Sequence, residues 1–234
     1  MQRQRDLPVA VIFDMDGVLV DSNPYHLAKW VEFLDHHKIS YKEEELPELI
    51  LGKRNDTAFE YFLGPDLTAE ESHRLSEEIE ETFRKVFKPH AKPLPGLDAL
   101  IRECDAAGIP MAVASSAVRS NIEFVVDALG YRPFFRTMVS GDDVTHAKPD
   151  PEIYLKAAEY LGVDPADAVA FEDSYVGIGA VNNAGMKCVA IASTFPSEKL
   201  VPLANLVIPS FEDINLEKLR ALFVAEGKSS SVAR

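Results

Sequence analysis

Two aspartates, Asp14 and Asp16, stand one residue apart in the stretch VAVIFDMDGVLVDS, where a short apolar run ends. Like charges this close repel each other and do not stabilise a strand, so a positive group is expected beside them. Carboxylates hold hard cations such as Mg²⁺, and an aspartate can attack phosphorus as a covalent nucleophile. Such a pair by itself is also typical of a turn or of a solvated acidic surface. It indicates phosphoryl transfer only if other groups join it.

Other polar residues with suitable chemistry follow later apolar runs of the chain. They are Ser115 and Ser116, which we take as candidates for substrate binding, Lys148 in the loop GDDVTHAKPDP, and Glu172 and Asp173. In open α/β sheets, ligands bind at the carboxyl ends of the strands, where such residues meet. We therefore expect four carboxylates, two hydroxyls and one lysine at one rim of a sheet.

This set of residues suits the transfer of a phosphoryl group with the help of Mg²⁺. The carboxylates of Asp14 and Asp173 and the backbone carbonyl of Asp16 could bind the metal. Asp14 would attack phosphorus, while Asp16 would protonate the leaving oxygen and later deprotonate the water that hydrolyses the aspartyl-phosphate. Ser115 and the backbone N–H groups after it would bind phosphate oxygens, and Lys148 would hold nucleophile and phosphate together.

Each of these residues also has an ordinary structural interpretation. Ser115 and Ser116 could cap the following helix, and Lys148 could be an exposed loop lysine. Glu172 and Asp173 could be acids that the dipole favours at a helix N-terminus. The occurrence of all the motifs in one chain favours the catalytic interpretation over these alternatives.

The runs that carry these residues are short, apolar and without alternation, which is typical of strands buried on both faces of a parallel sheet. They cover residues 8–15, 109–116, 136–140, 168–173, 186–192 and 205–210. Helical patterns lie between them at 97–107, 118–129, 151–161, 175–184 and 212–225. This alternation predicts a doubly wound α/β sheet.

Residues 23–92 break this rhythm, because no convincing strand pattern occurs there. Pro24 fits the first turn of a helix. Further helices are expected near 43–50, 55–63 and 68–88. We call residues 23–92 the helical insert, and we expect it to form a domain separate from a core of residues 1–22 and 93–234.

Composition limits the classes of partner. The formal net charge of −14 speaks against nucleic acid or an anionic membrane as the main partner. Cys104 and Cys188 are far apart and have no metal-ligand spacing, so we expect reduced thiols buried in the core. The chain shows neither a signal-peptide pattern nor an apolar stretch of membrane-spanning length. We therefore expect a cytoplasmic protein, and a monomer.

Four motifs, FDMDGVLVDS, VASS, AKPDP and FEDSYVGIGA, occur in order along the chain. They resemble those of the haloacid dehalogenase superfamily, in particular its β-phosphoglucomutase-like and phosphatase branch. The resemblance covers nearly the whole chain and implies a Rossmann-like core with an inserted helical cap. The roles that it implies are Asp14 as nucleophile, Asp16 as general acid/base, Ser115 and Lys148 as phosphate binders, Asp14, Asp16 and Asp173 as Mg²⁺ ligands, and Glu172 as a ligand or its support. Because dehalogenases and phosphonatases usually lack the acid at Asp16, its presence points to phosphate esters.

The resemblance also points to the helical insert for substrate choice. His26 and Trp30 stand where β-phosphoglucomutases carry His and Trp, and the segment LGKRND resembles the cap loop that sets specificity. After Gly52, however, Arg54 comes one place earlier than in the mutase pattern, which weakens the mutase interpretation. We expect His26, Arg54 and Asn55 to contact substrate, although His26 could be a packed surface histidine and Asn55 the N-cap of a helix. Trp30 is expected in the core.

The function that we expect is a Mg²⁺-dependent phosphatase for a small phosphorylated metabolite, acting through an aspartyl-phosphate. A phosphosugar mutase of the same fold is one alternative. A non-enzymatic phospho-receiver domain is another, but such domains are much shorter and have no place for the helical insert. A nicotinamide cofactor is not expected, because GIGAVNNAG has Asn182 where the dinucleotide fingerprint has its third glycine.

Overall fold

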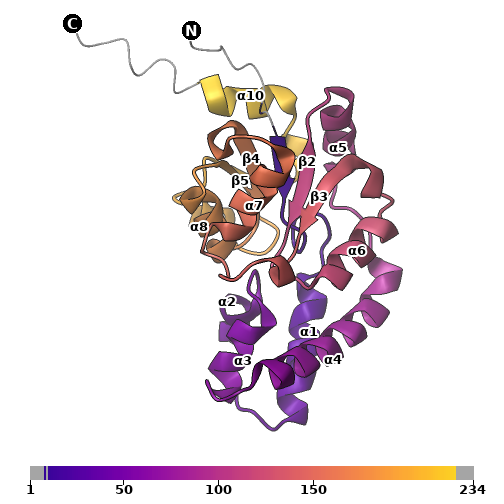
Figure 1. The fold of residues 1–234 in the computed structure, drawn as a ribbon, viewed down its shortest axis with the longest axis vertical. Helices are drawn as coiled ribbons and strands as arrows, with labels where there is room; N and C mark the ends of the chain where they lie inside the picture. Colours follow the sequence, from indigo (N-terminus) through magenta and orange to yellow (C-terminus); the bar gives the residue numbers. More distant parts are fainter. Residues whose placement is uncertain (1–7, 9, 225–234) are drawn as a thin grey trace, which may run out of the picture.

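The computed structural model of this chain describes residues 8 and 10–224, so the ends of the predicted core, residues 1–7, 9 and 225–234, lie outside the described residues. A six-stranded parallel sheet forms the centre, and further helices gather beyond the carboxyl ends of its strands (Figure 1). The predicted α/β fold with a parallel sheet and a helical region is confirmed.

The strands lie in the order β3-β2-β1-β4-β5-β6. Their bounds are β1 Ala10–Phe13, β2 Met111–Ala114, β3 Phe135–Val139, β4 Ala168–Glu172, β5 Lys187–Ile191 and β6 Leu206–Ile208. From β1 the chain adds β2 and β3 on one side, and it then returns to add β4, β5 and β6 on the other side. Open α/β sheets form their binding crevice at such a switch point, which here lies between β1 and β4. Because Phe13 of β1 pairs with Phe171 of β4, the residues that follow these two strands lie side by side.

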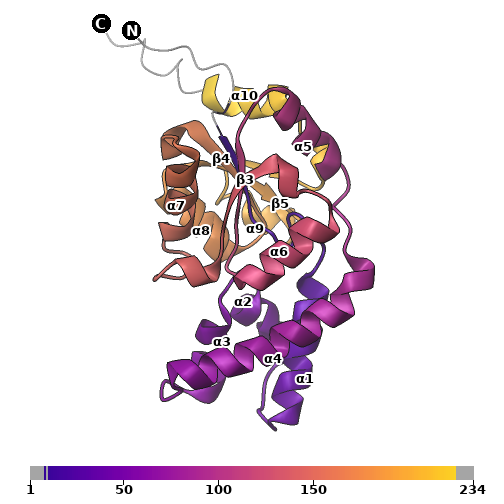
Figure 2. The same cartoon turned by 45° about the vertical axis from the view of Figure 1, so that its right-hand side comes forward.

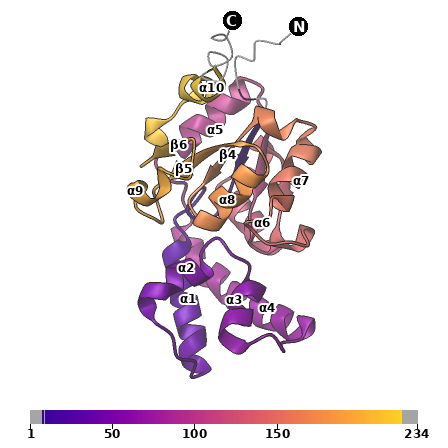
Figure 3. The same cartoon turned by 90° about the vertical axis from the view of Figure 1, so that its left-hand side faces the viewer.

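Helices cover both faces of the sheet, as Figures 2 and 3 show from two sides. On one face they are α5 Leu97–Ala106, α6 Arg119–Ala128 and α10 Leu216–Val224, and on the other α7 Glu152–Leu161, α8 Tyr175–Asn183 and the short α9 Ser197–Leu200. Successive residues of a strand point to opposite faces, so Val11 and Phe13 join one hydrophobic cluster while Ala10 and Ile12 join the other. The expectation of free, buried cysteines is confirmed.

The predicted helix over 212–225 is wrong at its start. Residues Phe211–Asp213 form a separate 3₁₀ turn, and α10 begins only at Leu216. Asn215 explains the break, because its side-chain carbonyl accepts a hydrogen bond of 3.0 Å from the N–H of Lys218. An asparagine in this role caps the new helix and separates it from the preceding turn.

The helical insert contains α1 Asn23–His36, α2 Leu46–Ile50, α3 Asn55–Leu63 and α4 Ala69–Phe87. It has a hydrophobic cluster of its own, in which Trp30 packs against Phe33 and Phe59. Only 1% of Trp30 is exposed, so its predicted core position is confirmed. Among the described residues, no helix combines the length and apolar character needed to cross a bilayer.

Candidate active site

Asp14 and Asp173 follow β1 and β4, the two strands at the switch point. The backbone N–H of Asp14 donates to the carbonyl of Phe171 at 3.0 Å, which fixes the ends of these strands against each other. Glu172 is the last residue of β4. Each of Asp14, Glu172 and Asp173 therefore brings a carboxylate oxygen to within 4.8 Å of the others, and all three residues are buried.

Lys148 lies between two of these carboxylates. Its Nζ donates to Asp14 Oδ1 at 2.7 Å and to Glu172 Oε1 at 2.6 Å, and 1% of its side chain is exposed. The alternative of an exposed loop lysine is therefore wrong. Burial by itself would lower the pKa of Lys148, but the charges of Asp14 and then Glu172 outweigh burial and raise that pKa.

The cluster has more acidic groups than Lys148 can neutralise. Burial raises the pKa of Asp14 to about 8, and burial followed by the charges of Glu172 and Asp14 raises the pKa of Asp173 well above its usual value. Burial would also raise the pKa of Glu172, but the adjacent Lys148 ammonium outweighs burial and lowers it. Buried carboxylate oxygens that outnumber the nearby positive charges are suitable ligands for a hard divalent cation.

Glu172 uses both of its oxygens within the protein. Oε1 accepts hydrogen bonds from Lys148 and, at 2.8 Å, from the hydroxyl of the buried Tyr154. Oε2 accepts from the backbone N–H groups of Asp173 at 2.9 Å and Ser174 at 3.2 Å, and from the Ser174 hydroxyl at 3.1 Å. This carboxylate is thus held by five donors, two from Lys148 and Tyr154 at the start of α7 and three from the residues between β4 and α8.

Asp14 and Asp173 each use one oxygen in the contacts that the structure describes. Asp14 accepts from Lys148 through Oδ1. Asp173 accepts through Oδ2 from Asn23 at 2.9 Å and from the hydroxyl of Thr194. The other oxygens, Asp14 Oδ2 and Asp173 Oδ1, are the carboxylate atoms that can approach a cation or a substrate.

Asp16 is paired with the helical insert. Its Oδ1 accepts from the hydroxyl of Ser22 and lies 3.1 Å from Nε2 of His26. Burial would raise the pKa of Asp16, but the charge and hydrogen bond of His26 and the hydrogen bond of Ser22 together outweigh burial and lower that pKa. Burial would lower the pKa of His26, but the charge and hydrogen bond of Asp16 and the charge of Glu80 together outweigh burial and raise that pKa. His26 also stacks on Phe83 with ring centroids 3.9 Å apart and is 12% exposed, so its ring is packed between Asp16 and Phe83.

A cavity of about 560 Å³ lies between the strand ends and the helical insert. The core contributes Asp14, Asp16 and Ser115 to its lining, and the insert contributes His26, Lys53 and Asn55. Its size is that of a small-molecule site. The carboxylate of Asp14 is therefore accessible from a cavity that could hold a small metabolite.

Comparison with known proteins agrees with this arrangement. The family model for haloacid dehalogenase-like hydrolases matches residues 11–191.

The chain belongs to this family.

It is 32% identical to the fructose-1-phosphate phosphatase of Escherichia coli over 77% of the chain and 95% of that protein. It is 38% identical to the bifunctional riboflavin kinase/FMN phosphatase of Arabidopsis thaliana over 64% of the chain, but spans only 42% of that longer protein. Among solved structures, the β-phosphoglucomutase of Clostridium difficile matches with a TM-score of 0.82 and 25% identity, over 93% of this chain and 97% of the other. The protein is therefore an enzyme of the haloacid dehalogenase-like hydrolase family.

The two serines after β2 occupy different positions in this hydrolase. The hydroxyl of Ser115 accepts a hydrogen bond of 3.2 Å from the backbone N–H of Ala117. The hydroxyl of Ser116 instead donates to the carbonyl of Gly52 in the insert at 2.9 Å. Both line the cavity. Helix α6 begins only at Arg119, so the interpretation of the serines as helix caps is wrong.

Arg54 and Asn55 line the cavity but are held by other residues. The guanidinium of Arg54 donates to the carbonyl of Val144 in the core at 3.1 Å and pairs with Asp56 at 2.5 Å. Asn55 is already the first residue of α3, so its interpretation as the N-cap is wrong. Its side-chain amide donates to Glu80 Oε1 at 2.7 Å.

Three partners of the site were missed by the sequence analysis. They are Asn23 and Thr194, which hold Asp173, and Tyr154, which bonds both Lys148 and Glu172. Thr194 lies shortly after β5, so the search for polar residues at strand ends could have found it if carried to that strand. Nothing in the sequence pattern singles out the buried hydroxyl of Tyr154 within the apolar face of α7.

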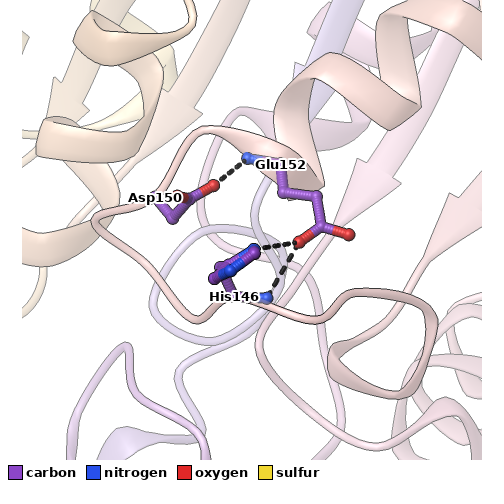
Figure 4. A group of neighbouring side chains, drawn as sticks. All are labelled: His146, Asp150 and Glu152. Atoms are coloured by element: carbon purple, nitrogen blue, oxygen red, sulfur yellow. Dashed lines mark hydrogen bonds and ion pairs between the residues drawn. The ribbon is translucent and has the colours of Figure 1, made fainter.

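A second group of potential ligands, His146, Asp150 and Glu152, lies at the start of α7 (Figure 4). Asp150 accepts the backbone N–H of Glu152 at 2.9 Å. Glu152 in turn accepts the N–H of His146 at 2.8 Å, and lies 3.1 Å from Nδ1 of the same histidine. These bonds hold the loop that carries Lys148 against the start of α7. We therefore interpret this group as structural.

Proposed function

We propose that the protein is a Mg²⁺-dependent phosphatase that moves the phosphoryl group of a small phosphorylated metabolite to Asp14 and then to water. The observation that carries this proposal is the buried group of Asp14, Lys148, Glu172 and Asp173 beside a cavity of metabolite size. The names of its relatives, which include a fructose-1-phosphate phosphatase and an FMN phosphatase, support a substrate of this class.

We assign three ligands to Mg²⁺, namely the carboxylates of Asp14 and Asp173 and the backbone carbonyl of Asp16. Bound there, the ion would neutralise the excess carboxylate charge and polarise the phosphoryl oxygens. Because both oxygens of Glu172 are engaged with protein donors, we assign Glu172 a supporting role, in which it fixes Lys148 and the backbone of Asp173.

In the first step, a carboxylate oxygen of Asp14 forms a bond to phosphorus while the bond from phosphorus to the leaving oxygen breaks. Asp16 gives its proton to that oxygen, so the product leaves as an alcohol. Lys148 holds the Asp14 carboxylate in place, and Ser115 with the following backbone N–H groups binds phosphoryl oxygens.

In the second step, Asp16 takes a proton from a water molecule, whose oxygen attacks phosphorus as the bond to Asp14 breaks. Inorganic phosphate leaves and the Asp14 carboxylate is restored. The charge and hydrogen bond of His26 favour the ionised form of Asp16. Asp16 must therefore take up a proton before the first step, and it returns to the ionised form, which accepts the proton of water, once that proton has passed to the leaving oxygen.

The test is phosphate release from para-nitrophenyl phosphate and from a panel of phosphorylated metabolites in the presence of Mg²⁺. We expect Asp14→Asn to lower kcat by about a thousandfold or more, because the nucleophile is lost. Asp105→Asn, an exposed aspartate of α5, is the matched control and should behave as the wild type. Absence of phosphate release from every ester by the wild type, or full activity of Asp14→Asn, would refute the proposal.

A phosphosugar mutase is the second candidate, supported by the structural likeness to the β-phosphoglucomutase of Clostridium difficile. A mutase must bind a phosphate at either end of its sugar. The guanidinium of Arg54, which could serve the second phosphate, is engaged by Val144 and Asp56, which favours the phosphatase. NMR of a hexose 1-phosphate supplied with a trace of its bisphosphate separates the two, because only a mutase would form the 6-phosphate.

A further inference from the structure

Asn121 joins the core to the helical insert. It lies on α6, is completely buried, and faces α4 of the insert, which runs beside α6 (Figure 2). Its Nδ2 donates to Glu80 Oε2 at 2.5 Å, and its Oδ1 accepts from Arg84 at 2.7 Å. Glu80 and Arg84 are one helical turn apart, where an acid and a base can pair directly, yet both bond to this one amide of the core.

Glu80 extends the connection to the cavity. It is 4% exposed and lines the cavity, and its second oxygen accepts from Asn55 Nδ2 at 2.7 Å. An ionised carboxylate only accepts hydrogen bonds, so both asparagines must turn their NH₂ groups toward Glu80. The carbonyl oxygen of Asn55 and the second N–H of its amide therefore remain for a ligand.

We propose that Glu80 is a positioning residue that, anchored on Asn121 of the core, orients Asn55 to accept a hydrogen bond from a hydroxyl group of the substrate. The inference rests on the proposed phosphatase function and narrows its substrate class to phosphomonoesters of polyhydroxylated compounds. Because Asn121 belongs to the core, the orientation of Asn55 depends on contact between core and insert. Recognition of the hydroxyl is thereby coupled to that contact.

The contact with Glu80 favours a hydroxyl over a second phosphate at Asn55 itself, while the basic side chains of Lys53 and Arg54 line the same cavity. A substrate group that reaches the carbonyl oxygen of Asn55 lies near a buried carboxylate, because Glu80 accepts a hydrogen bond from the amino group of the same amide. Both groups attract a hydrogen-bond donor and repel an anion. A site built to bond a hydroxyl discriminates strongly against a compound that lacks one, because its polar groups then stay unpaired.

The experiment compares a hexose monophosphate with para-nitrophenyl phosphate, which has no hydroxyl group to present to Asn55. We expect Glu80→Gln to lower kcat/KM for the hexose phosphate about tenfold or more, since one oriented hydrogen bond is lost, and to change kcat/KM for the aryl ester by less than about twofold. Asn55→Ala should show the same selectivity. Glu81→Gln, the exposed neighbour of Glu80 on α4, should change neither value.

Asn121→Ala tests the coupling, because Asn121 does not line the cavity. It should reproduce the selective loss of Glu80→Gln. Equal losses for both esters in the Glu80 and Asn121 variants would show a purely structural role, and no loss in either would also overturn the inference.

A second readout does not depend on turnover. In ¹⁵N-labelled protein, the side-chain NH₂ signals of Asn55 should shift and exchange faster in Glu80→Gln than in Glu81→Gln. Unchanged Asn55 signals would refute the positioning role. If the wild type cleaves neither ester while these signals change as expected, the proposed function fails but the orientation of Asn55 by Glu80 stands.

Discussion

Lys148 Nζ lies 2.7 Å from Asp14 Oδ1, although 134 positions separate the two residues in the chain. Their side chains are only 1% and 6% exposed, and the same ammonium also reaches Glu172. The lysine arrives on the loop before α7, while the two acids end neighbouring strands. Since this ion pair is withdrawn from water, each partner depends on the others to offset the cost of burying its charge.

We expect Lys148→Met to lower the free energy of unfolding by about 3–5 kcal/mol, because it leaves buried carboxylates without their cation. Urea denaturation at neutral pH measures this difference. Lys85→Met is the matched control, since it removes an exposed lysine that pairs with Glu81 on α4, and its midpoint should stay close to that of the wild type. A Lys148→Met variant as stable as the wild type would contradict the buried pairing.

The acidic cluster should bind Mg²⁺ more tightly as pH rises. The pKa of Asp14 is raised to about 8 and that of Asp173 is raised well above 3.8, so the metal-free folded state favours their protonated forms. In the absence of metal, the contribution of these two groups to the free energy of unfolding is therefore present at low pH, and it declines as pH rises toward their raised pKa values. Since Mg²⁺ must displace the protons, the increase in Tm that it causes should be larger at about pH 8 than at about pH 6.

Thermal unfolding with and without Mg²⁺ checks this expectation. Asp173→Asn should lose most of the Mg²⁺-dependent increase in Tm, whereas Glu152→Gln, in the second acidic group at α7, should retain it. An increase that is the same at both pH values would mean that the ion binds elsewhere or that the carboxylates are already ionised.

The pair of His26 and Asp16 should stabilise the fold within a limited pH window. The pKa of Asp16 is lowered from 3.8, so its contribution is present above pH 3.8 and lost as pH falls through the lower folded value. The pKa of His26 is raised from 6.5, so its contribution is full below pH 6.5 and lost as pH rises through the higher folded value. Both groups are charged between these limits.

His26→Gln should therefore lower the free energy of unfolding most between pH 3.8 and 6.5, and progressively less above that range. Denaturant unfolding over a pH series measures the difference. His36→Gln, an exposed histidine at the end of the same helix α1, is the control and should not show the window. A destabilisation by His26→Gln that is independent of pH would leave only the stacking on Phe83 as its cause.

Two glycines of α8 should differ in their tolerance of alanine. A Cβ at Gly177 would lie 1.8 Å from Glu172 Oε1, whereas a Cβ at Gly179 would lie 3.1 Å from Cβ of Pro149. Both substitutions raise helix propensity by the same amount, so a difference between the stabilities of the two variants reports how each Cβ packs. We expect Gly177→Ala to cost about 1–3 kcal/mol and to lower activity by displacing Glu172 from Lys148. Urea unfolding and phosphatase assays check this, and equal behaviour of the two variants would contradict it.

The sequence determined the elements and most of the site because both depend on local pattern. Apolar runs without alternation located all six strands to within about two residues at each end, a margin typical of such boundaries. Asp14, Lys148, Glu172 and Asp173 were identified because the carboxyl ends of parallel strands meet at one edge, whatever lies between them in the chain. The error at the start of α10 arose because the side chain of Asn215 caps a new helix there, which the periodicity of apolar residues does not report.

Only the tertiary structure decided which atoms of these residues remain free. Both oxygens of Glu172 accept hydrogen bonds from the protein, and the guanidinium of Arg54 donates to the carbonyl of Val144. Glu80 accepts from the amides of Asn55 and Asn121. Periodicity reports which face of an element a residue occupies, but not which element that face meets. Those contacts depend on how the helical insert packs against the core, and so the orientation of each polar group was set by the fold as a whole.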